Sequence, residues 1–189
     1  MVGIRDERAA ATRAKLLDAA REEFQAAGYA GGRVDGIADR AGVNKRLVYA
    51  HFGSKLDLFS TVLADNVARV DAAVPFTPDD LPDYAVRLFD HWVDDPTSMR
   101  LFSWRNVEVS GVPEFEDNTY RGMINQIEAN GTAQRAQLPA GHVLALVFAV
   151  LLAWVIPAEV FQADAQNHAE RLRRRQSVRA AVERITRSS

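Results

Sequence analysis

Glycines that follow apolar periodic runs constrain the fold of this 189-residue chain more than any other feature. Gly28, Gly42 and Gly53 each follow a run in which apolar residues recur every three or four positions, which is the spacing of one helical face. Glycine readily adopts the left-handed conformation in which many helices end. The pattern therefore predicts an amphipathic helix over about residues 8–27 and a short helix over residues 34–41.

Capping residues and prolines mark the remaining helix boundaries. Asn44 is a good N-cap for a third short helix that ends near Phe52, and Ser54 with Asp57 makes a capping-box start for a long fourth helix. Prolines begin or interrupt most of the later helices. These are expected over about Pro82–Val93, Thr97–Ser110, Pro113–Asn130, Pro139–Ala163 and Ala165–Arg187. The predicted fold class is all-α.

Charge is distributed unevenly along the chain. The formal net charge is -2, so the chain as a whole is not expected to bind nucleic acid through its net charge. Residues 1–56 carry ten Lys and Arg against seven Asp and Glu, whereas residues 57–189 carry thirteen against eighteen. A basic surface is therefore expected only in the N-terminal part.

The segment from Ile37 to Tyr49 has the anatomy of a helix-turn-helix. Small Ala38 lets the second helix approach closely, Gly42 makes the sharp turn, and Val43 fills the angle between the helices. Helical periodicity places Val48 and Phe52 on the inward face of the third helix. The outward face carries Arg46, Leu47 and Ala50, flanked by Lys45 and Tyr49 on one side and by Asn44 and His51 on the other. This outward face can enter a major groove.

The same stretch resembles the TetR family of bacterial repressors. The residues that match the family's diagnostic run are Ile37, Ala38, Ala41, Gly42, Val43, Tyr49, His51, Phe52 and Lys55. The resemblance covers about residues 10–60. It implies a homodimer, a third helix that reads a palindromic operator in double-stranded DNA, and a divergent C-terminal domain whose small-molecule effector releases the DNA. On this basis residues 1–56 are expected to form the DNA-binding domain and residues 57–189 the ligand-sensing and dimerisation domain.

The resemblance also implies roles for single side chains. The expected phosphate contacts are Tyr49, His51 and Lys55, and the expected base readers are Lys45, Arg46 and Leu47. Asn44, which lies beside them, is also expected to belong to the DNA-binding surface. Arg33 follows Gly32 where many relatives have Thr, so Arg33 is expected to replace a hydroxyl contact to phosphate. Arg46 and Leu47 stand where relatives often have Gly and Thr, which predicts an operator sequence of this protein's own.

Aromatic side chains are frequent on the C-terminal helices, and most of them must fill the core. Some are expected to line a ligand site, which also needs a few polar groups. The candidate ligand-binding residues are Trp92, Phe102, Trp104, Arg105, Tyr120 and Met123. A filled core without a pocket remains the alternative for each of them.

The run Val143–Trp154 has no polar stripe, so a helix there needs cover on every side. Pairing with the last helix and with the same two helices of a second subunit would supply that cover. The candidate dimer-interface residues are Leu146, Ala149, Val150, Ala153, Val178 and Val182. The longest uncharged stretch, residues 143–158, is shorter than the roughly 18–20 residues of a membrane span, and no signal-peptide pattern is present. A cytoplasmic protein without membrane association is expected.

Other charged groups leave alternatives open. Arg5, Arg8 and Arg13 could form a minor-groove arm, although a solvated, frayed terminus is favoured. The cluster of Arg171, Arg173, Arg174 and Arg175 could bind nucleic acid, although a solvated helix face is favoured. The cluster of Asp90, His91, Asp94 and Asp95 could bind a divalent metal, although a helix-end loop is favoured.

No signature of catalysis accompanies these features. The sequence has no cysteine, no nucleophile elbow, no phosphate-binding loop, no dinucleotide-binding glycine pattern and no zinc-protease motif. Neither an enzyme nor a bound metal or cofactor is expected. A helical protein-interaction module without DNA binding is the remaining alternative to a regulator, and salt-dependent retention of DNA would distinguish the two.

Overall fold

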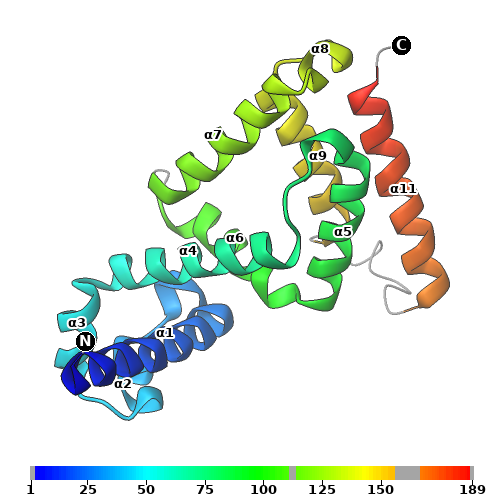
Figure 1. The fold of residues 1–189 in the computed structure, drawn as a ribbon. Coiled ribbons are helices and arrows are strands. Elements are labelled where there is room, and N and C mark those ends of the chain that lie inside the picture. Colours follow the sequence, from blue (N-terminus) through cyan, green and yellow to red (C-terminus); the bar gives the residue numbers. More distant parts are fainter. Residues whose placement is uncertain (1–2, 111–113, 156–166, 188–189) are drawn as a thin grey trace. The chain divides into compact units, whose positions relative to one another are not determined.

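The computed structural model describes residues 3–110, 114–155 and 167–187, and its regular structure in these ranges is helical throughout, as Figure 1 shows. This confirms the all-α prediction. The helices are α1 (Ile4–Gly31), α2 (Val34–Ala41), α3 (Lys45–Phe52), α4 (Lys55–Ala73), α5 (Leu81–Asp94), α6 (Pro96–Glu108), α7 (Glu114–Ala129), α8 (Thr132–Ala136), α9 (Ala140–Val155) and α11 (His168–Thr186), with a 3-10 turn at Pro78–Asp80.

The helix predictions agree with this list except at three places. The first helix was expected over about residues 8–27, but α1 begins at Ile4 and continues to Gly31 beyond a break in its helical backbone at Gly28. Helix α8 was not expected, because five residues are too few to show a helical period. The expected helices over Pro139–Ala163 and Ala165–Arg187 correspond to α9 and α11 only in part. Residues 156–166, with Pro157 and Phe161, and the expected start at Pro113 lie outside the described residues.

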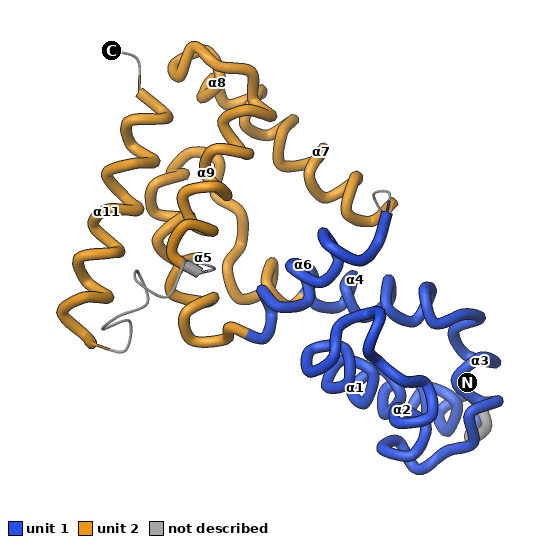
Figure 2. The backbone as a smooth tube through the Cα atoms, turned by 180° about the vertical axis from the view of Figure 1, so that it is seen from behind, with its two compact units in different colours: residues 1–68, 97–113 blue, residues 69–96, 114–189 orange. Residues whose placement is uncertain are grey.

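The chain forms two compact units, drawn in different colours in Figure 2. Unit 1 comprises residues 1–68 and 97–113, and unit 2 comprises residues 69–96 and 114–189. Helix α6 therefore packs with the N-terminal helices although it lies far along the chain. The functional division into residues 1–56 and 57–189 stays a prediction.

An apolar core holds α1, α2, α3 and α4 together in unit 1. Leu16 and Phe24 of α1, Ile37 of α2 and Phe59 of α4 are completely buried. The rings of Phe24 and Phe59 meet edge to face with centroids 5.0 Å apart, the geometry that aromatic pairs favour. The periodic apolar residues of the sequence are thus the residues that fix the orientation of the short helices.

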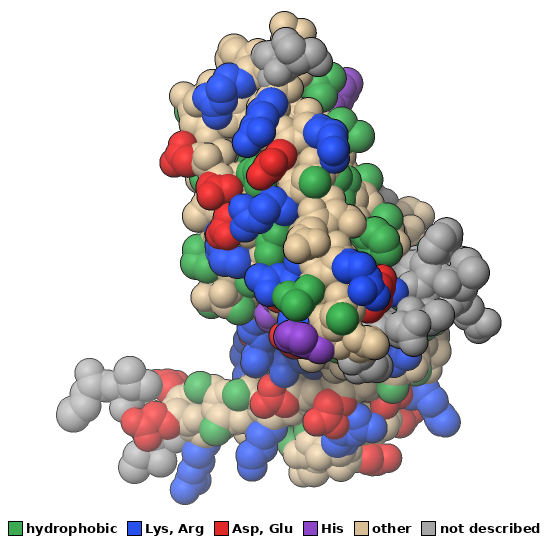
Figure 3. All heavy atoms as spheres, turned by 90° about the vertical axis from the view of Figure 1, so that its right-hand side faces the viewer, with side chains coloured by type: hydrophobic (Ala, Val, Ile, Leu, Met, Phe, Trp, Pro, Cys, Tyr) green, Lys and Arg blue, Asp and Glu red, His purple; other side chains and the backbone are tan. Residues whose placement is uncertain are grey.

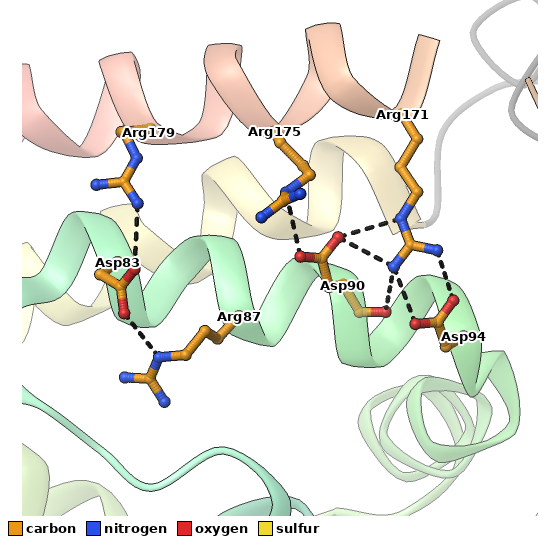
Figure 4. Close-up of polar contacts among 7 residues, drawn as sticks. All are labelled: Asp83, Arg87, Asp90, Asp94, Arg171, Arg175 and Arg179. Atoms are coloured by element: carbon orange, nitrogen blue, oxygen red, sulfur yellow. Dashed lines mark hydrogen bonds and ion pairs between the residues drawn. The ribbon is translucent and has the colours of Figure 1, made fainter. Parts of the chain in front are cut away.

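Unit 2 is built around α5, which packs against both α9 and α11. Leu88 and Phe89 of α5 and Val147 of α9 are buried in its core, at 1% exposure or less. Val178 and Val182 of α11 are completely buried in the same core. A row of ion pairs lies beside this core and also joins α5 to α11 (Figure 4).

Among the described residues, no helix has both the length and the apolar character needed to cross a membrane. Helix α9 has the most apolar sequence, but it is 16 residues long.

Candidate nucleic-acid interface

The connection between α2 and α3 has the sharp turn that the sequence predicts. Gly42 lies in the left-handed region at φ 67° and ψ 36°, and its N–H donates to the carbonyls of Ala38 and Asp39. The N–H of Val43 also donates to Ala38, at 3.0 Å. These bonds satisfy the last carbonyls of α2 in the manner of a glycine C-cap. The Oδ1 of Asn44 then accepts from Arg46 N at 2.9 Å and caps the start of α3.

Helix α3 presents the predicted faces. Val48 and Phe52 are buried, at 2% and 8% exposure. The exposed side chains are Lys45, Arg46, Leu47, Tyr49 and Ala50, which we call the reading face. His51 is half-buried, and its ring centroid lies 6.2 Å from that of Phe52. An eight-residue helix with one buried and one exposed face has the size and shape that a major groove admits.

Lys45 on the reading face is paired within the protein. Its Nζ lies 2.9 Å from Oδ1 of Asp35 on α2, and both side chains are exposed. The hydrogen bond to Asp35 raises the pKa of Lys45 above its ordinary value. Since an exposed pair of this kind contributes little stability, a DNA phosphate or base edge can replace Asp35 at small cost.

The start of α2 carries Arg33, whose predicted contact to phosphate stays a prediction. Arg33 is the N-cap residue and makes no side-chain cap. Its backbone N–H donates to Oε1 of Glu23 on α1 at 3.0 Å, while the Arg33 side chain is exposed. Glu23 also pairs with Arg40 of α2 at 3.5 Å. Glu23 was not among the predicted site residues, because its partners Arg33 and Arg40 lie at another helix, outside the local pattern.

Lys55 begins α4, as expected, but its ammonium faces the protein. Lys55 Nζ lies 3.3 Å from the carbonyl oxygen of Ala30 and 4.8 Å from the ring centroid of Tyr29. The phosphate contact expected of Lys55 therefore stays a prediction, and it requires these two contacts to be exchanged for a phosphate.

The N-terminal arginines do not form an extended arm. Helix α1 begins at Ile4, so Arg8 and Arg13 lie on a regular helix. Both alternatives predicted for Arg8 and Arg13, a minor-groove arm and a frayed terminus, are therefore wrong. The guanidinium of Arg13 lies 4.9 Å from the ring centroid of Phe52, the last residue of α3. The side chain of Arg5 lies outside the described residues.

Comparison with known families identifies both parts of the chain. Residues 16–62 match the family described as bacterial regulatory proteins, tetR family, and residues 80–184 match the tetracyclin repressor-like C-terminal domain. The second match alone spans more than half of the chain. This protein belongs to the TetR family.

Relatives and solved structures agree with that assignment. The transcriptional repressor SCO4008 of Streptomyces coelicolor is 40% identical over 98 residues, 52% of this chain and 51% of the relative. The repressor NicS of Pseudomonas putida is 33% identical over 112 residues, 56% of this chain and 53% of the relative. In both cases the similarity spans about half the length of the curated relative. The crystal structure of SCO4942 from Streptomyces coelicolor has a TM-score of 0.75 and 33% identity, and the match covers 91% of this chain and 96% of that one.

The six predicted ligand-binding residues fall into two groups. Phe102, Trp104 and Arg105 lie on α6 in unit 1, whereas Trp92, Tyr120 and Met123 lie on α5 and α7 in unit 2. Within unit 2, the rings of Trp92 and Tyr120 both approach Phe148 of α9, with centroids 6.4 and 6.0 Å away. Unit 2 therefore brings together an aromatic cluster of Trp92, Tyr120 and Phe148.

The buried Val178 and Val182 require a correction at the predicted dimer interface. Both are completely buried inside their own chain, so neither has surface to offer a second subunit. Leu146, Ala149 and Ala153 of α9 are exposed and Val150 is half-buried. Leu146 is 42% exposed, a large value for a leucine on a helix. The part of the predicted interface that this structure leaves accessible is one face of α9.

The two charge clusters with open assignments contact each other, as Figure 4 shows. Arg171 binds Asp90 at 3.0 Å and Asp94 at 2.6 Å, and Arg175 binds Asp90 at 3.1 Å. The hydrogen bond from Arg171 lowers the pKa of Asp94 below its ordinary value. The arginine cluster was expected to form a solvated helix face and the acidic cluster a helix-end loop. The structure corrects both predictions, because side chains of the two clusters form ion pairs with each other.

The remaining arginines of that cluster also have partners. Arg173 and Arg174 pair with Glu170, and the Arg174 guanidinium lies 5.3 Å from the Trp154 ring centroid. On the face drawn in Figure 3, blue Lys and Arg side chains are interspersed with acidic and hydrophobic ones. In the described ranges, no three His, Asp or Glu side chains come together in a way that could hold a metal ion.

Proposed function

We propose that this protein is a sequence-specific DNA-binding transcription regulator of the repressor type, released from a palindromic operator by a small molecule. The observation that carries the proposal is the exposed reading face of α3 on a helix-turn-helix with a glycine C-cap and an asparagine N-cap. Membership of the TetR family supports a regulator rather than an enzyme. The protein would act in the cytoplasm, where bacterial DNA is accessible.

The reading face suggests a division of work among its side chains. Lys45, Arg46 and Leu47 would contact base edges, since they lie near the start of the exposed helix that enters the groove. Contacts to phosphate would come from Arg33, Tyr49, His51 and Lys55, with Asn44 setting the start of the helix. Phosphate contacts fix the register, and base contacts select the sequence.

A homodimer would place two reading faces on one operator. Two third helices enter successive major grooves only when they are spaced by about one DNA turn, ~34–36 Å, or a multiple of it. The exposed face of α9, with Leu146, Ala149, Val150 and Ala153, would pair with its copy across a two-fold axis. Such pairing would cover apolar side chains that are accessible in the single chain.

The effector would act on the spacing of the two reading faces. A ligand that binds better to a conformation with another spacing weakens operator binding by its differential affinity, typically about 1–3 kcal/mol. The aromatic cluster of unit 2, with Met123 nearby in sequence, favours an apolar or aromatic molecule there. Phe102, Trp104 and Arg105 lie on α6, so they would take part in the response to the effector only if α6 also contacts the ligand.

Selection of bound sequences from random DNA tests the proposal. We expect enrichment of a palindrome, with an affinity that falls steeply as salt rises because phosphate-bound counterions are released. Retention without an enriched sequence would contradict a specific regulator. A protein that retains no DNA at low salt would favour the protein-interaction module instead.

A further inference from the structure

Helix α1 is interrupted near its end by a tight bend at Gly28, and α6 contacts this bend directly. Gly28 has φ 72° and ψ -175°, a combination that only glycine adopts readily. A Cβ at this position would lie 2.9 Å from Cδ2 of Trp104 and 2.9 Å from Oε2 of Glu108. Both side chains come from the last part of α6, which belongs to the same compact unit as α1. We call residues 28–32 the turn, and at Gly28 its backbone packs against α6 without room for a side chain.

Ala30, inside this turn, binds charged groups from two different helices. Its N–H donates to Oε2 of Glu108 at 2.9 Å, and its carbonyl accepts from Nζ of Lys55 at 3.3 Å. The Lys55 ammonium also lies over the ring of Tyr29, and that ring packs on Phe59 of α4 with centroids 5.3 Å apart. One residue therefore joins the end of α6 to the start of α4.

These contacts have the chemistry of positioning rather than of general packing. A hydrogen bond with one charged partner is stronger than a neutral one. Glu108 makes such a bond with Ala30 at 2.9 Å, and the Lys55 ammonium makes a longer one at 3.3 Å on the other side. Lys55 follows α3 by only the two residues Gly53 and Ser54. A displacement of the turn would therefore move the start of α4 and, through it, the end of α3.

We propose that Glu108, together with Trp104, is a positioning residue for the DNA-reading face. Glu108 holds Ala30 in place, Ala30 holds Lys55, and Lys55 is thereby placed before any DNA phosphate replaces the Ala30 carbonyl as its partner. Helix α6 thus influences DNA binding through contacts inside unit 1 and without touching DNA. The inference rests on the proposed function, because it assumes that α3 and Lys55 meet DNA.

Two measurements on the full-length protein test this role. The variants are Glu108→Ala, which removes the acceptor, and Glu108→Gln, which keeps a neutral acceptor at the same reach. Val107→Ala is the matched control, because Val107 is the neighbouring residue and is 82% exposed. Glu128→Ala in unit 2 controls for the loss of one negative charge. Hydrogen exchange is measured over residues 28–33, and DNA affinity on the sequence selected from random DNA.

We expect Glu108→Ala to speed exchange at the turn about tenfold and to weaken DNA binding about tenfold, while both controls stay within about twofold. Glu108→Gln should restore most of both properties, which a general loss of folding would not allow. Unchanged exchange in Glu108→Ala, or faster exchange with unchanged DNA affinity, would overturn the positioning role alone. A wild-type protein that selects no DNA sequence would refute the proposed function, and with it this inference.

Discussion

Both compact units combine an apolar core with ion pairs between helices, but the ion pairs are arranged differently. In unit 1 they are spread over several helix pairs, as with Arg21 and Asp65, Arg40 and Glu23, and Lys45 and Asp35, whereas in unit 2 they form a row between α5 and α11. In unit 1 the short helices surround a fully buried aromatic pair, Phe24 and Phe59, and the helix ends are capped by backbone bonds. In unit 2 the long helices α5 and α11 combine an apolar core with a row of ion pairs. The α5–α11 contact of unit 2 should therefore depend more on salt than the aromatic core of unit 1 does.

The largest expected effect is the loss of the aromatic core of unit 1. Phe24→Ala should lower the free energy of unfolding by about 3–5 kcal/mol, because it removes a completely buried ring and leaves a cavity beside Phe59. Urea denaturation followed by circular dichroism measures the change. The exposed Val107→Ala should cost less than about 0.5 kcal/mol. Similar losses in both variants would mean that this core does not stabilise the unit.

A comparably large effect is expected for the exposed face of α9. Leu146→Glu would place a charge in the proposed dimer interface at a cost of several kcal/mol of association energy. Sedimentation should show monomers for this variant and dimers for the wild type. Asn125→Glu, which adds the same charge to an exposed position of α7, should leave the dimer intact. A stable Leu146→Glu dimer would place the interface elsewhere.

A smaller, position-specific effect is expected on the reading face. Arg46→Ala should cost about 1–3 kcal/mol at one operator position and little elsewhere, since base contacts carry the sequence preference. Tyr49→Phe should instead weaken binding to all sequences alike, because it would remove the proposed phosphate contact. Competition assays with single-base operator variants separate the two patterns. Equal losses on every sequence for Arg46→Ala would contradict its role as a base reader.

The ion pairs of unit 2 should contribute less and depend on salt. Arg171→Ala removes contacts to Asp90 and Asp94 from a half-buried site, so we expect a loss of about 1–2 kcal/mol at low ionic strength that shrinks as salt is added. Arg121→Ala on α7 breaks an exposed pair with Asp117 and should change stability little. Thermal melts of both variants at two salt concentrations test this, and salt-independent loss in Arg171→Ala would point to packing instead.

The smallest expected effect is a response to acid. Hydrogen bonds from Arg87 and then Arg179 lower the pKa of Asp83 below its ordinary value of 3.8. The resulting stabilisation is present above pH 3.8 and is lost as the pH falls through the lowered pKa. Wild type should therefore lose stability more steeply than Asp83→Asn as the pH falls below about 3.8. The free energy of unfolding of both proteins is measured against pH. Parallel curves for the two proteins would show that Asp83 does not contribute to the acid response.

Local sequence patterns predicted the short helices of unit 1 well, because residues close together in the sequence determine where those helices begin and end. The bounds of α2 and α3, the turn at Gly42 and the cap at Asn44 follow from glycine conformation and side-chain capping. Glu23 and Glu108 were not assigned these roles, since their acceptor oxygens serve backbone groups that are distant in sequence.

Unit 2 was harder to predict because its contacts join distant parts of the chain. Arg171 and Asp90 are 81 positions apart, so each was interpreted without its partner. Val178 was predicted at a dimer interface from its helical spacing, but spacing cannot tell which neighbour covers an apolar face. The type of side chain predicted that Val178 is buried. Only the tertiary packing decides which helix covers it.

The three tryptophans are divided between the units in a way that gives each unit its own optical reporter. Trp104 lies in unit 1 against the turn at Gly28, whereas Trp92 and Trp154 lie in unit 2. A protein that carries Trp92→Phe and Trp154→Phe would emit from the α6 contact alone, and one that carries Trp104→Phe would emit from unit 2 alone. The fluorescence lifetimes of these two proteins, measured with and without an effector or DNA, would show which unit each of them perturbs. No dye has to be attached.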